Sequence, residues 1–123
     1  MNYFLFLTDP IEFEEGVARV VSGTPTEWTG HSKAHPGDRV LLYLTRGQGI
    51  AYEWRVDVGF KAGPRDYRAI VSHIRPIEPP IGIDELREEF GQEEWAVPHN
   101  MSRYSAVLIP ELFVDRILGL REN

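Results

Sequence analysis

The sequence predicts an α+β domain built on one curved, partly closed sheet of about five to six strands, with about three helices. Three observations lead to this fold class. Apolar and aromatic residues cluster or alternate over strand-length segments. Short turns that contain glycine connect consecutive strands, as in hairpins. Helical patterns are confined to the start, to the region before residue 90 and to the C-terminus, which favours α+β over a β-α-β repeat.

The chain has 123 residues, of which 42% are hydrophobic and 26% charged, and we expect a single domain over residues 1–123. It contains no cysteine, which excludes disulfides and thiolate metal ligands. No run of 18 apolar residues is present, and the N-terminus lacks the basic segment of a signal peptide. We therefore expect a cytoplasmic protein without a membrane span.

The N-terminal segment reads as a strand followed by a helix. The apolar run Tyr3–Thr8 predicts a buried strand. Asp9, Pro10 and Glu12 form a helix start, because Asp9 can cap and Pro10 suits the first turn. The helix should extend to about Arg19 and bury one face, which consists of Ile11, Phe13 or Val17, and Val20. Residues 23–36 hold many helix and strand breakers and predict a long functional loop.

The middle of the chain carries the clearest strand signals. Residues 38–45 and 50–58 predict two strands joined by a hairpin turn at residues 46–49. In the second strand apolar and polar residues alternate, which places Trp54 in the core. Residues 61–65 predict a Gly/Pro loop, and residues 67–77 another strand. That strand should end at the prolines that follow, Pro76, Pro79 and Pro80.

The C-terminal part is more helical. Residues 84–90 predict a short acidic helix, 91–100 an irregular segment and 102–109 an extended segment. A final helix over residues 110–118 should carry an apolar side made of Leu112, Phe113, Ile117 and Leu118.

The net charge of −6 counts against a protein that binds long stretches of nucleic acid by neutralising their phosphates with Lys and Arg. It does not count against one that binds a single base in a pocket. The charge is also uneven, because residues 31–75 contain eight Lys and Arg side chains and three histidines but only four acids. A locally basic face is expected on an acidic protein.

The segment Val20–Gly23 gives the most specific indication of a ligand. Read as a tight turn after the first helix, it places Ser22 at the edge of the sheet with Trp28 close behind. A hydroxyl and an indole in one concave site can hold a flat heterocycle, the indole by stacking and the hydroxyl by hydrogen bonding.

The order of these short motifs resembles the EVE branch of the PUA-like superfamily, which is related to YTH domains. The resemblance covers nearly the whole chain and rests on the following residues: 3–8, 20–23, 36–40 with the apolar strand after them, 50–53, Trp95, Ser102–Arg103 and Pro110 with the terminal helix. It implies a PUA-like open barrel and recognition of a modified or flipped nucleobase without catalysis.

In the YTH relatives a Trp–Ser pair follows the first helix and forms part of an aromatic cage. Here Ser22 matches the serine, but Val21 stands in place of the tryptophan. Trp28, Trp54, Phe60 or Tyr67 remain alternatives for the missing aromatic face. The resemblance further implies site roles for Thr8 and Asp9 at the end of the first strand and for Ser102 and Arg103, with Tyr104 where the relatives often have an acid.

The predicted base pocket therefore comprises Thr8, Asp9, Val21, Ser22, Trp28, Trp95, Ser102, Arg103 and Tyr104. For Trp95 the first interpretation is a residue that pins its loop to the body of the domain, and pocket lining is the second. The predicted phosphate contacts are His31, Lys33 and Arg103. His31 and His35 have the spacing of metal ligands on a helix, but Gly30 and Pro36 argue against a helix there, so no metal site and no other cofactor are expected.

Two other functions remain open. The ASCH group, also PUA-like, includes hydrolases of acylated cytidine, and the segment from Gly23 to Glu27 resembles part of its motif. Pro25 stands where that chemistry uses a lysine, so a nucleophile there lacks its activating group. The third possibility is a domain that binds free nucleosides or another small molecule. We expect a monomer that binds RNA or DNA carrying a modified base, and no catalytic residue.

Overall fold

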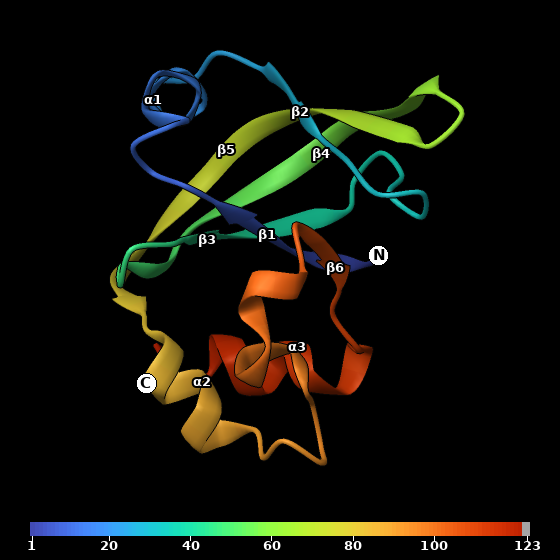
Figure 1. The fold of residues 1–123 in the computed structure, drawn as a ribbon. Helices are drawn as coiled ribbons and strands as arrows, with labels where there is room; N and C mark the ends of the chain where they lie inside the picture. The colour runs from blue at the N-terminus through green and yellow to red at the C-terminus, as the bar shows by residue number, and fades with distance from the viewer. Residues whose placement is uncertain (122–123) are drawn as a thin grey trace.

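The computed structural model describes residues 1–121, and across these the chain forms six strands, three α-helices and two short 3-10 helices (Figure 1). Their bounds in chain order are β1 Tyr3–Thr8, α1 Glu14–Val21, β2 Thr26–Thr29, β3 Arg39–Leu44, β4 Gly49–Gly63, β5 Asp66–Ile81, α2 Ile83–Glu89, η1 Val97–His99, η2 Met101–Arg103, β6 Ala106–Leu108 and α3 Glu111–Leu118.

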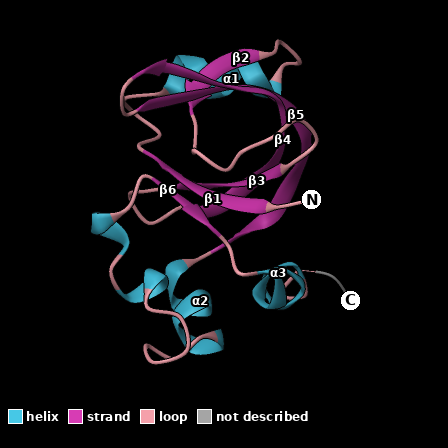
Figure 2. Ribbon diagram, turned by 90° about the vertical axis from the view of Figure 1, so that its right-hand side faces the viewer, coloured by secondary structure: helices cyan, strands magenta, loops and turns pink. Residues whose placement is uncertain are grey.

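All six strands belong to one sheet, in the order β2-β5-β4-β3-β1-β6. Strand β1 runs parallel to β3, and every other neighbouring pair is antiparallel. The sheet curls so that the edge strands β2 and β6 face each other across its interior without pairing, with α1 beside β2 (Figure 2). The expected α+β fold with a partly closed barrel is confirmed.

Two apolar cores lie on the two faces of the sheet. The inner core fills the barrel and includes Phe4, Phe6, Trp28 and the fully buried Trp54. The outer core lies between the sheet and the C-terminal helices, which cover the lower part of the sheet in Figure 1. Odd-numbered residues of β1 and β3, such as Leu5 and Leu41, face this outer core, while Phe4 and Val40 face the inner one, as the period of two in a strand requires.

The hairpin of β4 and β5 is much longer than predicted. Residues 61–63 belong to β4 rather than to a loop, and β5 continues through Pro76, Pro79 and Pro80 to Ile81. Strand β2 pairs only with residues 68–71 of β5, so the remainder of β5 has a free edge. A proline there removes no ladder hydrogen bond on that edge, which is why the strand does not stop.

Helix α1 begins later than predicted. Asp9 caps a turn over residues 10–13, and the helix itself begins at Glu14 and includes Val20 and Val21. The predicted tight turn at Val20 is therefore the last helical turn. Val20 is buried, but Ile11 and Phe13 are 65% and 47% exposed, so the predicted apolar face is only partly correct. The predicted loop after the helix contains β2, which sequence analysis missed.

The C-terminal part matches the predictions more closely. Helices α2 and α3 lie where they were expected, although Leu112 is exposed rather than buried. The predicted extended segment 102–109 is a strand only over Ala106–Leu108, because η2 occupies its beginning. None of the described helices is long and apolar enough to cross a membrane.

Candidate functional site

A cavity of about 410 Å³ opens where the end of β1, helix α1 and strand β2 meet, at the seam that the curled sheet leaves unclosed. Its volume falls within the range of about 300–1,000 Å³ that is usual for ligand cavities. The lining residues are Phe6, Leu7, Thr8, Phe13, Gly16, Arg19, Thr26, Glu27, Trp28, Thr29, Arg68 and Ser105. We call it the seam cavity.

Two of the aromatic rings that line the seam cavity, those of Trp28 and Phe13, lie next to each other in its apolar wall. Trp28 is the only buried residue of β2 and packs edge-on against Trp54, with 5.1 Å between the ring centroids. The ring of Phe13 lies 5.9 Å from that of Trp28 and is half exposed. Gly16 of α1 faces the Trp28 ring and lets the helix approach it closely. The wall therefore combines one fixed ring with one that is free to contact a ligand.

Thr8 supplies the polar group next to this wall. It ends β1 and is 4% exposed, yet its hydroxyl has no hydrogen-bond partner within residues 1–121. The hydroxyl oxygen itself is not completely enclosed, so it is open to the cavity and free for a ligand. A flat molecule with a polar edge suits such a combination of rings and hydroxyl.

The rim of the seam cavity is charged but balanced. The guanidinium of Arg68 donates to the Thr29 hydroxyl at 3.4 Å and pairs with the Glu27 carboxylate at 3.4 Å. Arg19 pairs with Glu15 at 3.6 Å. The rim therefore carries donors and acceptors without a large excess of either charge.

The predicted site residues are divided between different places. Thr8 and Trp28 line the seam cavity together. Val21 and Ser22 line another cavity, of about 650 Å³, on the opposite flank of α1. The Ser22 hydroxyl donates to the Arg19 carbonyl at 2.9 Å and thereby belongs to the end of the helix. The expectation that Ser22 and Trp28 share one site is wrong, because the helical turn places them on different flanks.

Asp9, Ser102 and Tyr104 line a third cavity, of about 480 Å³. Asp9 accepts two hydrogen bonds from Arg46, both 3.0 Å long, and one from the backbone N–H of Ile11 at 2.9 Å. These bonds, above all those from Arg46, lower the pKa of Asp9 to about 2. Its carboxylate is thus occupied by capping and by the ion pair.

Trp95 lies in the outer core, where its ring packs against Phe90 and Phe113 at centroid distances of 5.0 and 5.5 Å. It does not line any of the three cavities described above. This position fits the first interpretation of Trp95, as an anchor of its loop. Arg103 is exposed and belongs to η2.

The predicted phosphate contacts His31 and Lys33 lie in the loop between β2 and β3. The Nδ1 atom of His31 accepts the backbone N–H of Lys33 at 3.1 Å, and its ring lies 5.0 Å from that of Phe4. Burial, together with the nearby Lys33, lowers the pKa of His31 below its usual value, which favours the neutral ring. Lys33 is exposed and keeps its charge available. Within residues 1–121, no three His, Asp or Glu side chains are grouped as metal ligands.

Sequence analysis missed Phe13, Gly16 and Arg68 as neighbours of the seam cavity. Phe13 was assigned to the core because the helix was expected to begin at Pro10. The strand Thr26–Thr29 was not recognised, and only its pairing with β5 brings Arg68 to the rim. A buried tryptophan between exposed polar neighbours was the available signal for that strand.

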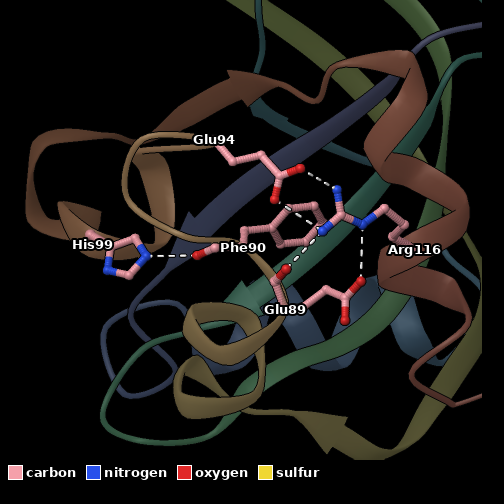
Figure 3. Close-up of polar contacts among 5 residues, drawn as sticks. All are labelled: Glu89, Phe90, Glu94, His99 and Arg116. Carbon is pink, nitrogen blue, oxygen red and sulfur yellow. Dashed lines mark hydrogen bonds and ion pairs between the residues drawn. The ribbon is translucent and has the colours of Figure 1, made fainter.

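A dense cluster of charged contacts lies away from the seam cavity, at the edge of the outer core (Figure 3). Arg116 of α3 binds the Glu89 carboxylate at 2.9 Å and the Glu94 carboxylate at 2.7 Å, and its guanidinium stacks on the Phe90 ring at 4.4 Å. His99 contacts the Phe90 carbonyl through Nε2 at 2.8 Å. All its members hold α2, α3 and the intervening segment together, which indicates a structural role.

The sequence matches no protein-family model and no curated protein sequence. Solved structures match it closely in fold. A protein from Pseudomonas putida has 20% sequence identity and a TM-score of 0.76, with 98% of this chain and 99% of that chain covered. Human THYN1, solved in complex with DNA containing 5-methylcytosine, has 16% identity and a TM-score of 0.72, with 100% and 99% covered.

A variant of ZmASCH from Zymomonas mobilis has 12% identity and a TM-score of 0.64, with 99% of this chain and 100% of that chain covered. At these identities the likeness concerns the fold. Together with the curled six-stranded sheet and its three helices, it gives the chain a PUA-like fold.

Proposed function

We propose that this protein is a non-catalytic module of the EVE type that binds nucleic acid by taking one modified base, turned out of its strand, into the seam cavity. The observation that carries this proposal is the unpartnered hydroxyl of Thr8, which opens onto one cavity together with the rings of Trp28 and Phe13. The likeness in fold to human THYN1, which was solved with DNA containing 5-methylcytosine, supports it.

The energetics explain why a modified base is the expected ligand. Turning a base out of a stack costs a few kcal/mol, while stacking on an aromatic side chain returns roughly 1–3 kcal/mol. The two terms nearly cancel, so a small added contact decides whether binding occurs. A methyl group against an apolar wall contributes roughly 0.8 kcal/mol, which is enough to favour the modified base.

The net charge of −6 adds little general attraction for phosphates. We therefore expect weak binding of unmodified nucleic acid at physiological salt.

The test is a binding series by fluorescence anisotropy with labelled oligonucleotides. The series contains single-stranded DNA, duplex DNA and RNA, each unmodified or carrying one modified base such as 5-methylcytosine. We expect at least one modified oligonucleotide to bind about fourfold more tightly, or better, than its unmodified counterpart, the equivalent of roughly 0.8 kcal/mol. Equal affinity across all pairs, or tight binding of unmodified duplex, would contradict the proposal.

Paired variants connect the binding to the seam cavity. Phe13→Ala removes the half-exposed ring of the cavity wall, whereas Ile11→Ala removes an exposed apolar side chain that lines the cavity on the other flank of α1. Phe13→Ala should lose most of the preference for the modified base. Ile11→Ala should retain it.

A hydrolase of modified nucleosides is the second candidate, because Glu27 places a carboxylate at the rim of the same cavity and ZmASCH has a similar fold. The ion pair with Arg68 and the proline at position 25 favour binding over catalysis. Release of cytidine from acylated cytidine, followed by chromatography and abolished in Glu27→Gln, would support the hydrolase. Calorimetric binding of free nucleosides without any response to oligonucleotides would support a small-molecule domain instead.

A further inference from the structure

One end of this acidic molecule is cationic. It consists of the tip of the β4–β5 hairpin, residues 58–68, and the loop of residues 30–37, and we call it the basic end. It contains Lys33, Lys61, Arg65 and Arg68 against the single acid Asp66, so its net charge is +3 with the histidines neutral. The whole chain carries −6. The net positive charge of the basic end therefore comes from two segments that are far apart in the sequence.

Backbone contacts hold these two segments together. The N–H of Gly30 donates to the Tyr67 carbonyl at 2.8 Å, and the N–H of Gly37 donates at the same distance to the carbonyl of Val56, two residues before the hairpin tip. Gly59 lies against the loop so closely that an added Cβ atom would stand 2.6 Å from the Ala34 carbonyl oxygen. Figure 1 shows the hairpin projecting from the barrel with the β2–β3 loop beside it. The two segments of the basic end thus form one continuous surface.

Most of its cations are available to a partner. Within residues 1–121, the side chains of Lys33, Lys61 and Arg65 have no ion pair with a carboxylate, and all three are exposed. Lys61 contacts only the Tyr67 ring, at 5.7 Å from its centroid. By contrast, Arg46 is engaged by a carboxylate at 3.0 Å. Unpaired cations on a surface favour a polyanion as the partner.

The basic end adjoins the seam cavity. Arg68 and Thr29 line the cavity. Arg68 belongs to β5 at the hairpin tip, and Thr29 ends β2, which leads into the loop of residues 30–37. Arg65 lies in the turn before β5, three residues from Arg68, so their Cα atoms are at most roughly 10–11 Å apart. In a nucleic acid helix that distance corresponds to about three nucleotides of one strand. A strand with one base in the cavity therefore has its neighbouring phosphates within reach of the basic end.

We propose that the basic end binds the sugar-phosphate backbone on one side of the base held in the seam cavity, through Lys33, Lys61 and Arg65. This inference rests on the proposed function and adds to it the path of the strand. Phe60, 38% exposed and opposite Arg68 in the β4–β5 pairing, provides an apolar surface for the adjoining sugar or base.

The test measures how the affinity for the best modified oligonucleotide depends on salt, for the wild-type chain and the double variant Lys61→Gln/Arg65→Gln. Each lost phosphate contact should reduce the slope of log affinity against log salt by roughly 0.7 for a single strand or 0.9 for a duplex. The double variant should therefore lose roughly 1.4–1.8 units of slope. Arg55→Gln is the control, since Arg55 is exposed but paired with Asp57 and lies six residues before Lys61.

A second measurement places the contacts on the oligonucleotide. Phosphates on either side of the modified base are replaced singly by uncharged methylphosphonates. On one side of the modified base, the replacement should lower the affinity of the wild-type chain severalfold and that of the double variant hardly at all. Equal effects on both proteins at every position would overturn the proposal.

The outcomes separate the two proposals. If the wild-type chain prefers no modified oligonucleotide, the proposed function fails and this inference fails with it. Suppose the preference for the modified base is present, but the double variant keeps the wild-type salt slope or Arg55→Gln lowers that slope as much as the double variant does. Only the proposed role of the basic end is then rejected. Retained preference for the modified base with a reduced slope supports both.

Discussion

Gly16 of helix α1 faces the ring of Trp28 so closely that a Cβ atom added at Gly16 would stand 2.8 Å from a ring carbon. Real Cβ atoms do not approach other atoms so closely, so the absence of a side chain at this position sets the distance between α1 and β2. Both elements line the seam cavity. The shape of the cavity therefore depends on this contact.

The first prediction is that Gly16→Ala destabilises the protein. In an ordinary helix interior this change stabilises by roughly 0.5–1 kcal/mol. Here the added methyl must displace a buried indole that is packed on Trp54, and such overpacking costs about 1–3 kcal/mol. We expect the free energy of unfolding, measured by urea denaturation, to fall by about 1 kcal/mol. Gly91→Ala is the control, because an added Cβ there meets no atom within 4 Å; a stabilised Gly16→Ala would contradict the prediction.

Much of this fold could be predicted from the sequence because its strands are apolar where they are buried. The run Tyr3–Thr8 and the alternation that begins at Ile50 define β1 and the first half of β4. Whether the prolines of β5 end the strand or lie within it could not be predicted from the sequence. Whether a proline ends a strand depends on whether the neighbouring edge is paired, and that depends on the length of β2.

The site was only partly predictable, for a related reason. Thr8 and Trp28 were recognised, and they line one cavity. The flank of α1 on which Ser22 lies depends on where the helix begins and ends, and the capping signal at Asp9 misplaced its start by about one turn. Arg68 reaches the rim through pairing between strands about forty residues apart, which no local pattern contains.

The second prediction concerns the free hydroxyl in the seam cavity. Thr8→Val keeps the size of the side chain and removes an oxygen that has no partner in the described part of the chain, so folding stability should change little. Affinity for the modified oligonucleotide should fall about five- to thirtyfold, the equivalent of one hydrogen bond of roughly 1–2 kcal/mol. Anisotropy titrations test this, with Thr45→Val in a different cavity as the matched control.

The third prediction is that Asp9 titrates with a pKa near 2 in the folded protein. Its usual pKa in an unfolded chain is about 3.9. Because the folded pKa is the lower one, the Asp9–Arg46 pair stabilises the protein above about pH 4, and this contribution disappears as the pH falls towards 2. Carboxyl NMR titration measures the value directly. In Arg46→Gln it should rise towards the usual value, and an unchanged value would show that Arg46 is not the main cause.

The fourth prediction concerns Arg116, whose guanidinium contacts three partners at once (Figure 3). It donates to the Glu89 and Glu94 carboxylates and to the Glu89 carbonyl, at 2.7–3.0 Å, and stacks on Phe90. A lysine keeps the charge but not the planar fork, so Arg116→Lys loses several of these bonds and the stacking. We expect a melting temperature several degrees lower. Arg19→Lys, in an exposed pair with Glu15 within one helix, should leave it nearly unchanged. Equal melting temperatures of the two variants would mean that charge alone, rather than the geometry of the guanidinium, holds α3 against the segment after α2.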